Sequence, residues 1–195
     1  MRVLGLDTTG ANCSVSIVDD ARVLAHICEP LKRGHAERLA PMVADALDAA
    51  RLTPDQIDRI AVCTGPGGFT GLRVALSFAI GFAMPRDLPV VGIDALDVKA
   101  NEIQFTEPDA LVGIYRDVRR GEVFSAIYSH GFALNPPAAM AYSEAETRAH
   151  DLQAGLYEAA NVDTRILAWL AIDRDPATHP AEPLYARGPD AKLPG

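Results

Sequence analysis

A glycine-rich segment near the middle of the chain constrains the fold most strongly. It reads GPGGFTGLRVA over residues 65–75, and it joins an apolar run, Ile60–Cys63, to apolar residues whose spacing predicts a helix over 71–84. Glycines between a strand and a helix either expose backbone N–H groups to a phosphate or allow a sharp corner. The segment therefore predicts an α/β unit with one of two local roles.

The corner is the role that we favour. Gly67 and Gly68 allow a sharp exit from the strand, and Thr70 is a suitable N-cap for a helix that starts at Gly71. No lysine follows as it does in a Walker motif. Phosphate binding stays the second reading, with the candidate residues Asp7, Gly65, Gly67, Thr70 and Arg73. For Asp7 itself, at the end of the first expected strand, an Asx-type turn is preferred.

The rest of the N-terminal half predicts a sheet with two covering helices. Residues 2–7, 13–18 and 23–28 are typical of three strands in a meander, and 34–52 have helical spacing that Pro41 interrupts. The helix over 71–84 carries Val74, Phe78 and Phe82 opposite its main stripe, so we expect it to be covered on both sides. The two apolar stripes predict a protein interface at Leu39, Met42, Val43, Ala46, Leu47, Gly71, Leu72, Ala75, Leu76 and Ala79.

The C-terminal half gives weaker signals. The pattern indicates a strand over 89–93, a helix over 94–102, two strands with a turn at Gly121, a helix over 163–172 and a tail from 176 that covers the surface. The two strands span 110–115 and 122–128. The segment 129–160 shows no clear period. We expect two lobes, over residues 1–100 and 101–195, the second of them smaller.

Composition narrows the possible functions. A net charge of −8 opposes nucleic-acid binding by the chain alone, so an RNA-binding alternative rests only on Arg116, Arg119 and Arg120. The three cysteines lack metal or disulfide spacing. We identify no signal peptide and no membrane span, and we expect a cytoplasmic protein.

Several motifs, in order along nearly the whole chain, resemble the TsaB (YeaZ) family. They are LGLDTT with CSV near the start, GHAERLAPM, GPGGFTGLR, DVRRGEVF and the closing AEPLYAR over 181–187. Two departures are Gly68, where the family has a serine, and a segment over 129–163 that is shorter than usual.

The resemblance implies an α/β actin/hexokinase-like ATPase (ASKHA) fold, with two small lobes of mixed sheets flanked by helices. It implies a non-catalytic subunit that pairs with TsaD, which transfers threonylcarbamoyl to N6 of adenosine 37 in ANN-decoding tRNAs. It further implies a homodimer when TsaD is absent, an ATPase partner, TsaE, and contact with tRNA only through the complex. No cofactor is expected for the isolated chain, while ATP or ADP at the interface with TsaD stays open.

The residues that would carry catalysis are absent from the sequence. Where catalytic relatives hold a metal with two histidines, the resemblance aligns Ala95 and Lys99, neither of which is a suitable ligand. No HExxH motif occurs, which excludes the metalloprotease reading. The alternative function is an autonomous actin-like ATP-binding protein or kinase, which would use Asp7 and the glycine segment.

Overall fold

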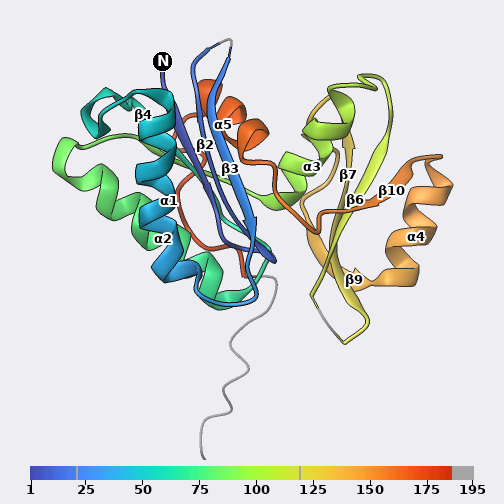
Figure 1. Cartoon of the computed structure of the whole chain (residues 1–195). Helices are drawn as coiled ribbons and strands as arrows, with labels where there is room; N and C mark the ends of the chain where they lie inside the picture. The colour runs from blue at the N-terminus through green and yellow to red at the C-terminus, as the bar shows by residue number, and fades with distance from the viewer. Residues whose placement is uncertain (21, 119, 186–195) are drawn as a thin grey trace, which may run out of the picture.

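The computed structural model describes residues 1–20, 22–118 and 120–185, and these residues form two sheets with helices around them (Figure 1). The first sheet has five strands in the order β3-β2-β1-β4-β5. Its strands are β1 (Val3–Asp7), β2 (Asn12–Val18), β3 (Val23–Pro30), β4 (Arg59–Cys63) and β5 (Val90–Ile93). The first three are antiparallel, as expected for a meander, and β4 and β5 run parallel to β1.

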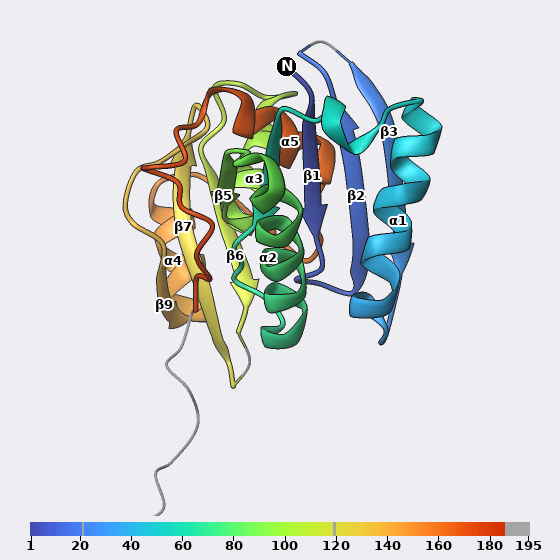
Figure 2. The same cartoon turned by 90° about the vertical axis from the view of Figure 1, so that its left-hand side faces the viewer.

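Helices cover both faces of the first sheet (Figure 2). One face packs against α1 (His35–Ala50) and α2 (Phe69–Ala83), and the other packs against α5 (Thr164–Asp173). Short 3-10 turns follow α1 and α2, at Pro54–Gln56 and Met84–Arg86. Pro41 lies inside α1, which starts only six residues earlier.

The second sheet is smaller and pairs β10-β6-β7-β8, with β9 also pairing β7. Its strands are β6 (Val112–Asp117), β7 (Glu122–Ser129), β8 (Phe132–Ala133), β9 (Ala138–Ala141) and β10 (Gly155–Glu158). Helix α3 (Ala95–Gln104) packs on one side and α4 (Tyr142–Asp151) on the other. Gly121 has a φ of 76°, as the turn prediction requires.

The two halves of the chain interlock, although the division into lobes at residue 100 stays a prediction. Helix α5 comes from the second half but packs on the first sheet, and the Arg59 guanidinium donates to the carbonyls of Ala171, Ile172 and Arg174 at its end. The described part of the tail follows the edge of the same sheet, where Gly92 N–H donates to His179 O at 2.9 Å. The first lobe is therefore built from both ends of the chain.

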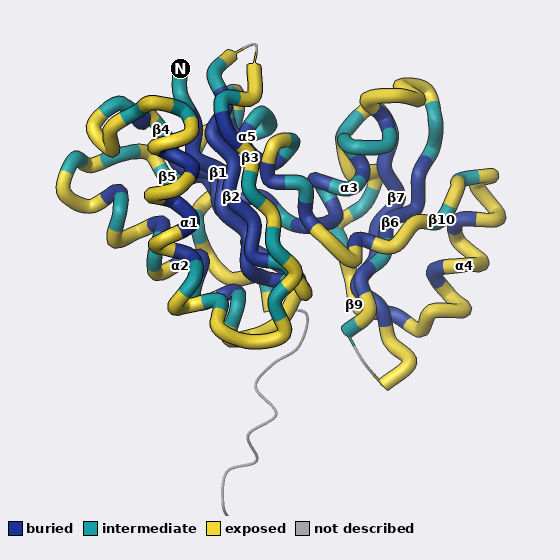
Figure 3. Tube along the Cα trace, viewed as in Figure 1, coloured by how far each residue is buried: buried dark blue, intermediate teal, exposed yellow. Residues whose placement is uncertain are grey.

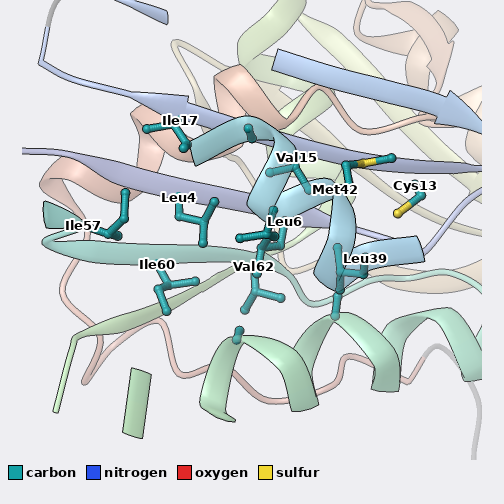
Figure 4. Close-up of a cluster of buried hydrophobic side chains, with 14 of the residues drawn as sticks. Leu4, Leu6, Cys13, Val15, Ile17, Leu39, Met42, Ile57, Ile60 and Val62 are labelled. Atoms are coloured by element: carbon teal, nitrogen blue, oxygen red, sulfur yellow. The ribbon is translucent and has the colours of Figure 1, made fainter. Parts of the chain in front are cut away.

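The larger core lies between the first sheet and the α1–α2 layer. Figure 4 shows side chains from β1, β2, β4 and α1 meeting there, among them Leu6, Val15, Leu39, Met42 and Val62. Figure 3 shows the same division along the trace, because the central strands are buried and the outer turns of the helices are exposed. Within the described residues, we find no helix with both the length and the apolar character needed to cross a membrane.

Candidate functional site: the glycine corner and the outer helix face

The glycine segment packs against the turn that follows β1. A Cβ atom at Gly71 would lie well inside van der Waals contact of the Thr8 carbonyl oxygen, and one at Gly67 would lie 2.6 Å from the Thr9 carbonyl oxygen. Two hydrogen bonds join the segments: Gly68 N–H donates to Thr9 O at 2.8 Å, and the Thr8 hydroxyl donates to Gly71 O at 2.6 Å. The glycines therefore allow a close backbone crossing, which supports the corner reading.

The start of α2 differs from the sequence prediction. The helix begins at Phe69, Gly68 occupies the N-cap position, and no side chain caps the helix. Thr70 is thus already inside the first turn, so its assignment as the N-cap was wrong. The Gly68 N–H is also taken by Thr9 O, which removes one donor that a phosphate would need.

Asp7 is held inside the protein. Its Oδ1 accepts hydrogen bonds from the Thr9 N–H at 3.0 Å and the Thr9 hydroxyl at 2.7 Å, which is the Asx-type turn expected for this residue. Burial raises the pKa of the Asp7 carboxyl, while the Thr9 hydrogen bonds and the Arg116 charge oppose the rise. A carboxyl in this setting stabilises the turn and is not presented to solvent.

Arg116 reaches from the second sheet to this corner. Its buried guanidinium donates to the Ala159 carbonyl and, at 3.3 Å, to the Thr9 carbonyl. The RNA-binding alternative rested partly on Arg116, but the Arg116 side chain is buried and joins β6 to the turn after β1, so it is not available to RNA. Arg119, also named in that alternative, lies outside the described residues.

Arg73 belongs to an exposed aromatic cluster. Its guanidinium carbon lies 3.7 Å from the centroid of the Phe69 ring, and its Nε donates to the Tyr185 hydroxyl at 3.3 Å. The two rings lie 5.4 Å apart. Sequence reasoning missed this cluster, because Tyr185 is 112 positions away from Arg73 and no local pattern links them. The tail motif over 181–187 is described only as far as Tyr185.

The ten residues predicted for the partner interface lie on the inward faces of the helices and are not exposed to a partner. Of the ten residues, nine are buried in the chain's own core: Leu39, Met42, Val43, Ala46, Leu47, Leu72, Ala75, Leu76 and Ala79. The tenth, Gly71, contacts the Thr8 carbonyl. The physical reason is that the sheet offers the larger apolar surface, so the most continuous stripe of each helix packs inward.

Helix α2 nevertheless exposes a second apolar surface. Ile80 is 46% exposed and Met84 73% exposed. On another side of the helix, half-buried Phe78 and Phe82 stack on each other with ring centroids 5.9 Å apart. The neighbouring α1 exposes small side chains, which would allow another helix to approach closely. We use the name outer helix face for the apolar side chains of these two helices that are exposed, which are Ala36, Ala40, Ala44, Phe69, Ile80 and Met84, and for the half-buried Val74, Phe78 and Phe82, which also pack against the core.

The two positions that align with the metal-binding histidines of catalytic relatives hold a core residue and a member of an ion pair. Ala95 is buried, and Lys99 Nζ lies 3.2 Å from a Glu102 carboxylate oxygen. Among the described residues, no group of three or more His, Cys, Asp or Glu side chains could hold a metal ion. The absence of a metal from the working protein stays a prediction.

The fold and the site define a class: small α/β proteins with two sheets flanked by helices, a closed glycine corner and apolar side chains on the outer side of two helices. The family described as "TsaD: tRNA N6-adenosine threonylcarbamoyltransferase" matches residues 23–146. The solved YeaZ structure from Pseudomonas aeruginosa is similar with a TM-score of 0.75 and 26% identity, covering 94% of this chain and 99% of that one.

Two sequence relatives agree with this result. The tRNA threonylcarbamoyladenosine biosynthesis protein TsaB of Escherichia coli (strain K12) is 36% identical over 128 residues, covering 66% of this chain and 55% of the relative. An uncharacterized protein of Mycobacterium tuberculosis (strain H37Rv) is 34% identical, with 97% and 93% covered. The chain belongs to the TsaB (YeaZ) family. It matches about half the length of the Escherichia coli relative.

Proposed function

We propose that the chain is the non-catalytic dimerisation subunit of the bacterial machinery that makes N6-threonylcarbamoyladenosine at position 37 of tRNA. It would support TsaD, the subunit that transfers threonylcarbamoyl to the adenosine of ANN-decoding tRNAs. The observation that carries the proposal is the outer helix face, where Phe69, Ile80 and Met84 stay exposed among the described residues. The similarity to the Escherichia coli tRNA threonylcarbamoyladenosine biosynthesis protein TsaB supports the pathway.

The outer helix face is suited to pairing with a related protein. Exposed Ile80 and Met84, together with the exposed edges of Phe78 and Phe82 on another side of α2, would pack against the equivalent helices of TsaD and bury on the order of 1,600 Å² in all. Without TsaD, the same face would pair with a second copy, since an isologous contact between related lobes needs little change. TsaE would act on the pair, tRNA would be reached through the complex, and the location would be cytoplasmic.

The contacts of Asp7 and Arg73 within the chain favour a non-catalytic role. Asp7 is committed to Thr9, and Arg73 is committed to Phe69 and Tyr185. Phosphate binding at Asp7, Gly65, Gly67, Thr70 and Arg73 is therefore not proposed for the isolated chain. ATP or ADP at the interface would require TsaD to complete the site.

The test is light scattering during gel filtration, on the chain alone and mixed with TsaD of the same organism. The informative variant is Ile80→Glu, because a charge on the exposed face should prevent association without entering the core. Leu152→Glu is the matched control, since Leu152 is 47% exposed but lies beyond helix α4 on the other lobe. Leu76 and Ala79 are unsuitable, because charges there would unfold the core.

We expect a homodimer that exchanges into a one-to-one complex with TsaD, lost in Ile80→Glu and kept in Leu152→Glu. A chain that is a monomer and does not bind TsaD would refute the proposal. Tight Mg-ATP binding by the isolated chain, measured by calorimetry, would favour the autonomous ATPase instead.

A further inference from the structure

A large cleft lies between the lobes, away from the outer helix face. Its walls come from α3, α5, the turn between β7 and β8 and the segment 173–179, and its volume is about 1270 Å³. Helix α5 covers the face of the first sheet opposite to α1 and α2 (Figure 2). The cleft and the outer helix face are therefore separate surfaces, and both could be occupied at once.

Aromatic side chains line the cleft and remain exposed. Phe105, just after α3, is 81% exposed, and Phe132, in β8, is 73% exposed. Half-buried Trp169 and Leu170 of α5 add to the same wall. Two phenylalanines this exposed around one cleft are more typical of an interaction site than of scattered surface residues.

The rim of the cleft is acidic. Asp173, at the end of α5, and Asp175 are exposed, whereas the Asp20 carboxylate, also in the lining, is paired with the N-terminal ammonium at 2.9 Å. The arginine in the lining, Arg174, already has partners within the chain, because its Nη1 lies 3.0 Å from Asp97 Oδ2 and 2.8 Å from His179 Nε2. Apart from the histidines of the lining, the charge available to an incoming ligand is negative.

The size and charge select the kind of ligand. Sites for small molecules measure roughly 300–1,000 Å³, and this cleft is larger. A nucleic acid would bring its phosphates against the carboxylates of Asp173 and Asp175. A peptide with apolar side chains on one face and lysine or arginine on the other could contact the aromatic side chains of the cleft and the carboxylates of its rim at the same time.

We propose that this interlobe cleft docks a basic amphipathic segment of a partner protein. Its apolar side chains would contact Phe105, Phe132 and Trp169, and its cationic side chains would face Asp173 and Asp175. This docking goes beyond the proposed pairing with TsaD through the outer helix face, and it does not depend on it.

The chain carries its own probe, because Trp169 is its only tryptophan and lines the cleft. The intact protein is titrated with a synthetic leucine/lysine amphipathic peptide without aromatic residues, and Trp169 emission is followed. A leucine/glutamate peptide of equal length is the control. We expect a saturable change with the lysine peptide, weakened by salt because the rim contacts are screened, and none with the glutamate peptide.

Matched variants locate the binding. Phe132→Ser should raise Kd by about tenfold as an exposed aromatic anchor, while Leu152→Ser should leave it unchanged. Replacing Asp173 and Asp175 with Asn should weaken binding and reduce its salt dependence, in contrast to Glu146→Gln on α4.

Three outcomes would overturn the proposal. One is equal binding of the two peptides, and another is a Kd unchanged in Phe132→Ser. The third is a saturable, strongly salt-dependent change of Trp169 emission with tRNA but not with the lysine peptide, which would assign the cleft to nucleic acid.

Discussion

At the scale of single residues, two glycines of α2 lie in different surroundings. Gly71 crosses the Thr8 backbone so closely that a Cβ atom has no room, whereas a Cβ atom at Gly81 would meet nothing within 4 Å. Glycine in a helix is otherwise unfavourable by roughly 0.5–1 kcal/mol relative to alanine. The same substitution should therefore have opposite effects at the two positions.

We expect Gly71→Ala to lower the free energy of unfolding by about 2 kcal/mol or more, because backbone must move to admit the methyl group. Gly81→Ala should raise it by roughly 0.5–1 kcal/mol. Urea denaturation followed by circular dichroism measures both. A tolerated alanine at Gly71 would contradict the close crossing on which the corner depends.

Asp94 should give the protein a distinctive pH dependence. Burial, followed by the nearby Asp97 charge, raises the pKa of the Asp94 carboxyl to about 7. Between the ordinary carboxyl pKa of about 4 and this value, the folded state keeps a proton that the unfolded state has released. This group therefore lowers the free energy of unfolding as pH rises, by at most about 1.4 kcal/mol per pH unit.

Asp94→Asn removes the titration but keeps an oxygen that can accept the Asp97 N–H bond, which is 2.7 Å long in the structure. We expect the free energy of unfolding to fall less between pH 5 and pH 8 in this variant than in the original protein. Glu146→Gln, on exposed α4, is the control. Identical pH profiles for Asp94→Asn and the original protein would contradict the account.

At the scale of elements, the sequence predicts regular segments better than it predicts what they contact. The alternation over 13–18 and the helical period over 34–52 located β2 and α1 well. Helix α4 and strand β10 were missed because they are short and largely exposed. The period of α2 could not show which face meets the sheet, since apolar residues surround much of the helix.

The docking of α5 depends on a buried polar contact. Thr164 Oγ1 lies 2.9 Å from Ser14 Oγ and 2.6 Å from Ser16 Oγ, and all three side chains are buried. Thr164→Val should lower the free energy of unfolding by about 1–3 kcal/mol, because Ser14 loses the partner that this contact supplies. Thr147→Val, at an exposed hydroxyl of α4, should change it by less than about 0.5 kcal/mol. Equal effects would refute this role for Thr164.

At the scale of the whole molecule, the contacts that shape the candidate surfaces join distant parts of the chain. Arg116 connects the second sheet to the turn after β1, and Tyr185 meets Phe69 and Arg73 of α2. Motif order predicted the family and the fold, but a local period carries no information about such pairs. The interlobe cleft was missed for the same reason, because Phe105, Phe132 and Trp169 come together only in the folded chain.

The central claim is that the chain supports TsaD through the outer helix face without performing the transfer. The most direct test measures the transfer of threonylcarbamoyl from threonylcarbamoyl adenylate to tRNA by purified TsaD. The reaction is run with the original chain, with the Ile80→Glu variant, with the Leu152→Glu variant and with no addition. The account predicts product with the original chain and with Leu152→Glu, at least about tenfold less with Ile80→Glu, and none from the chain without TsaD. Full activity of TsaD without this chain would contradict it.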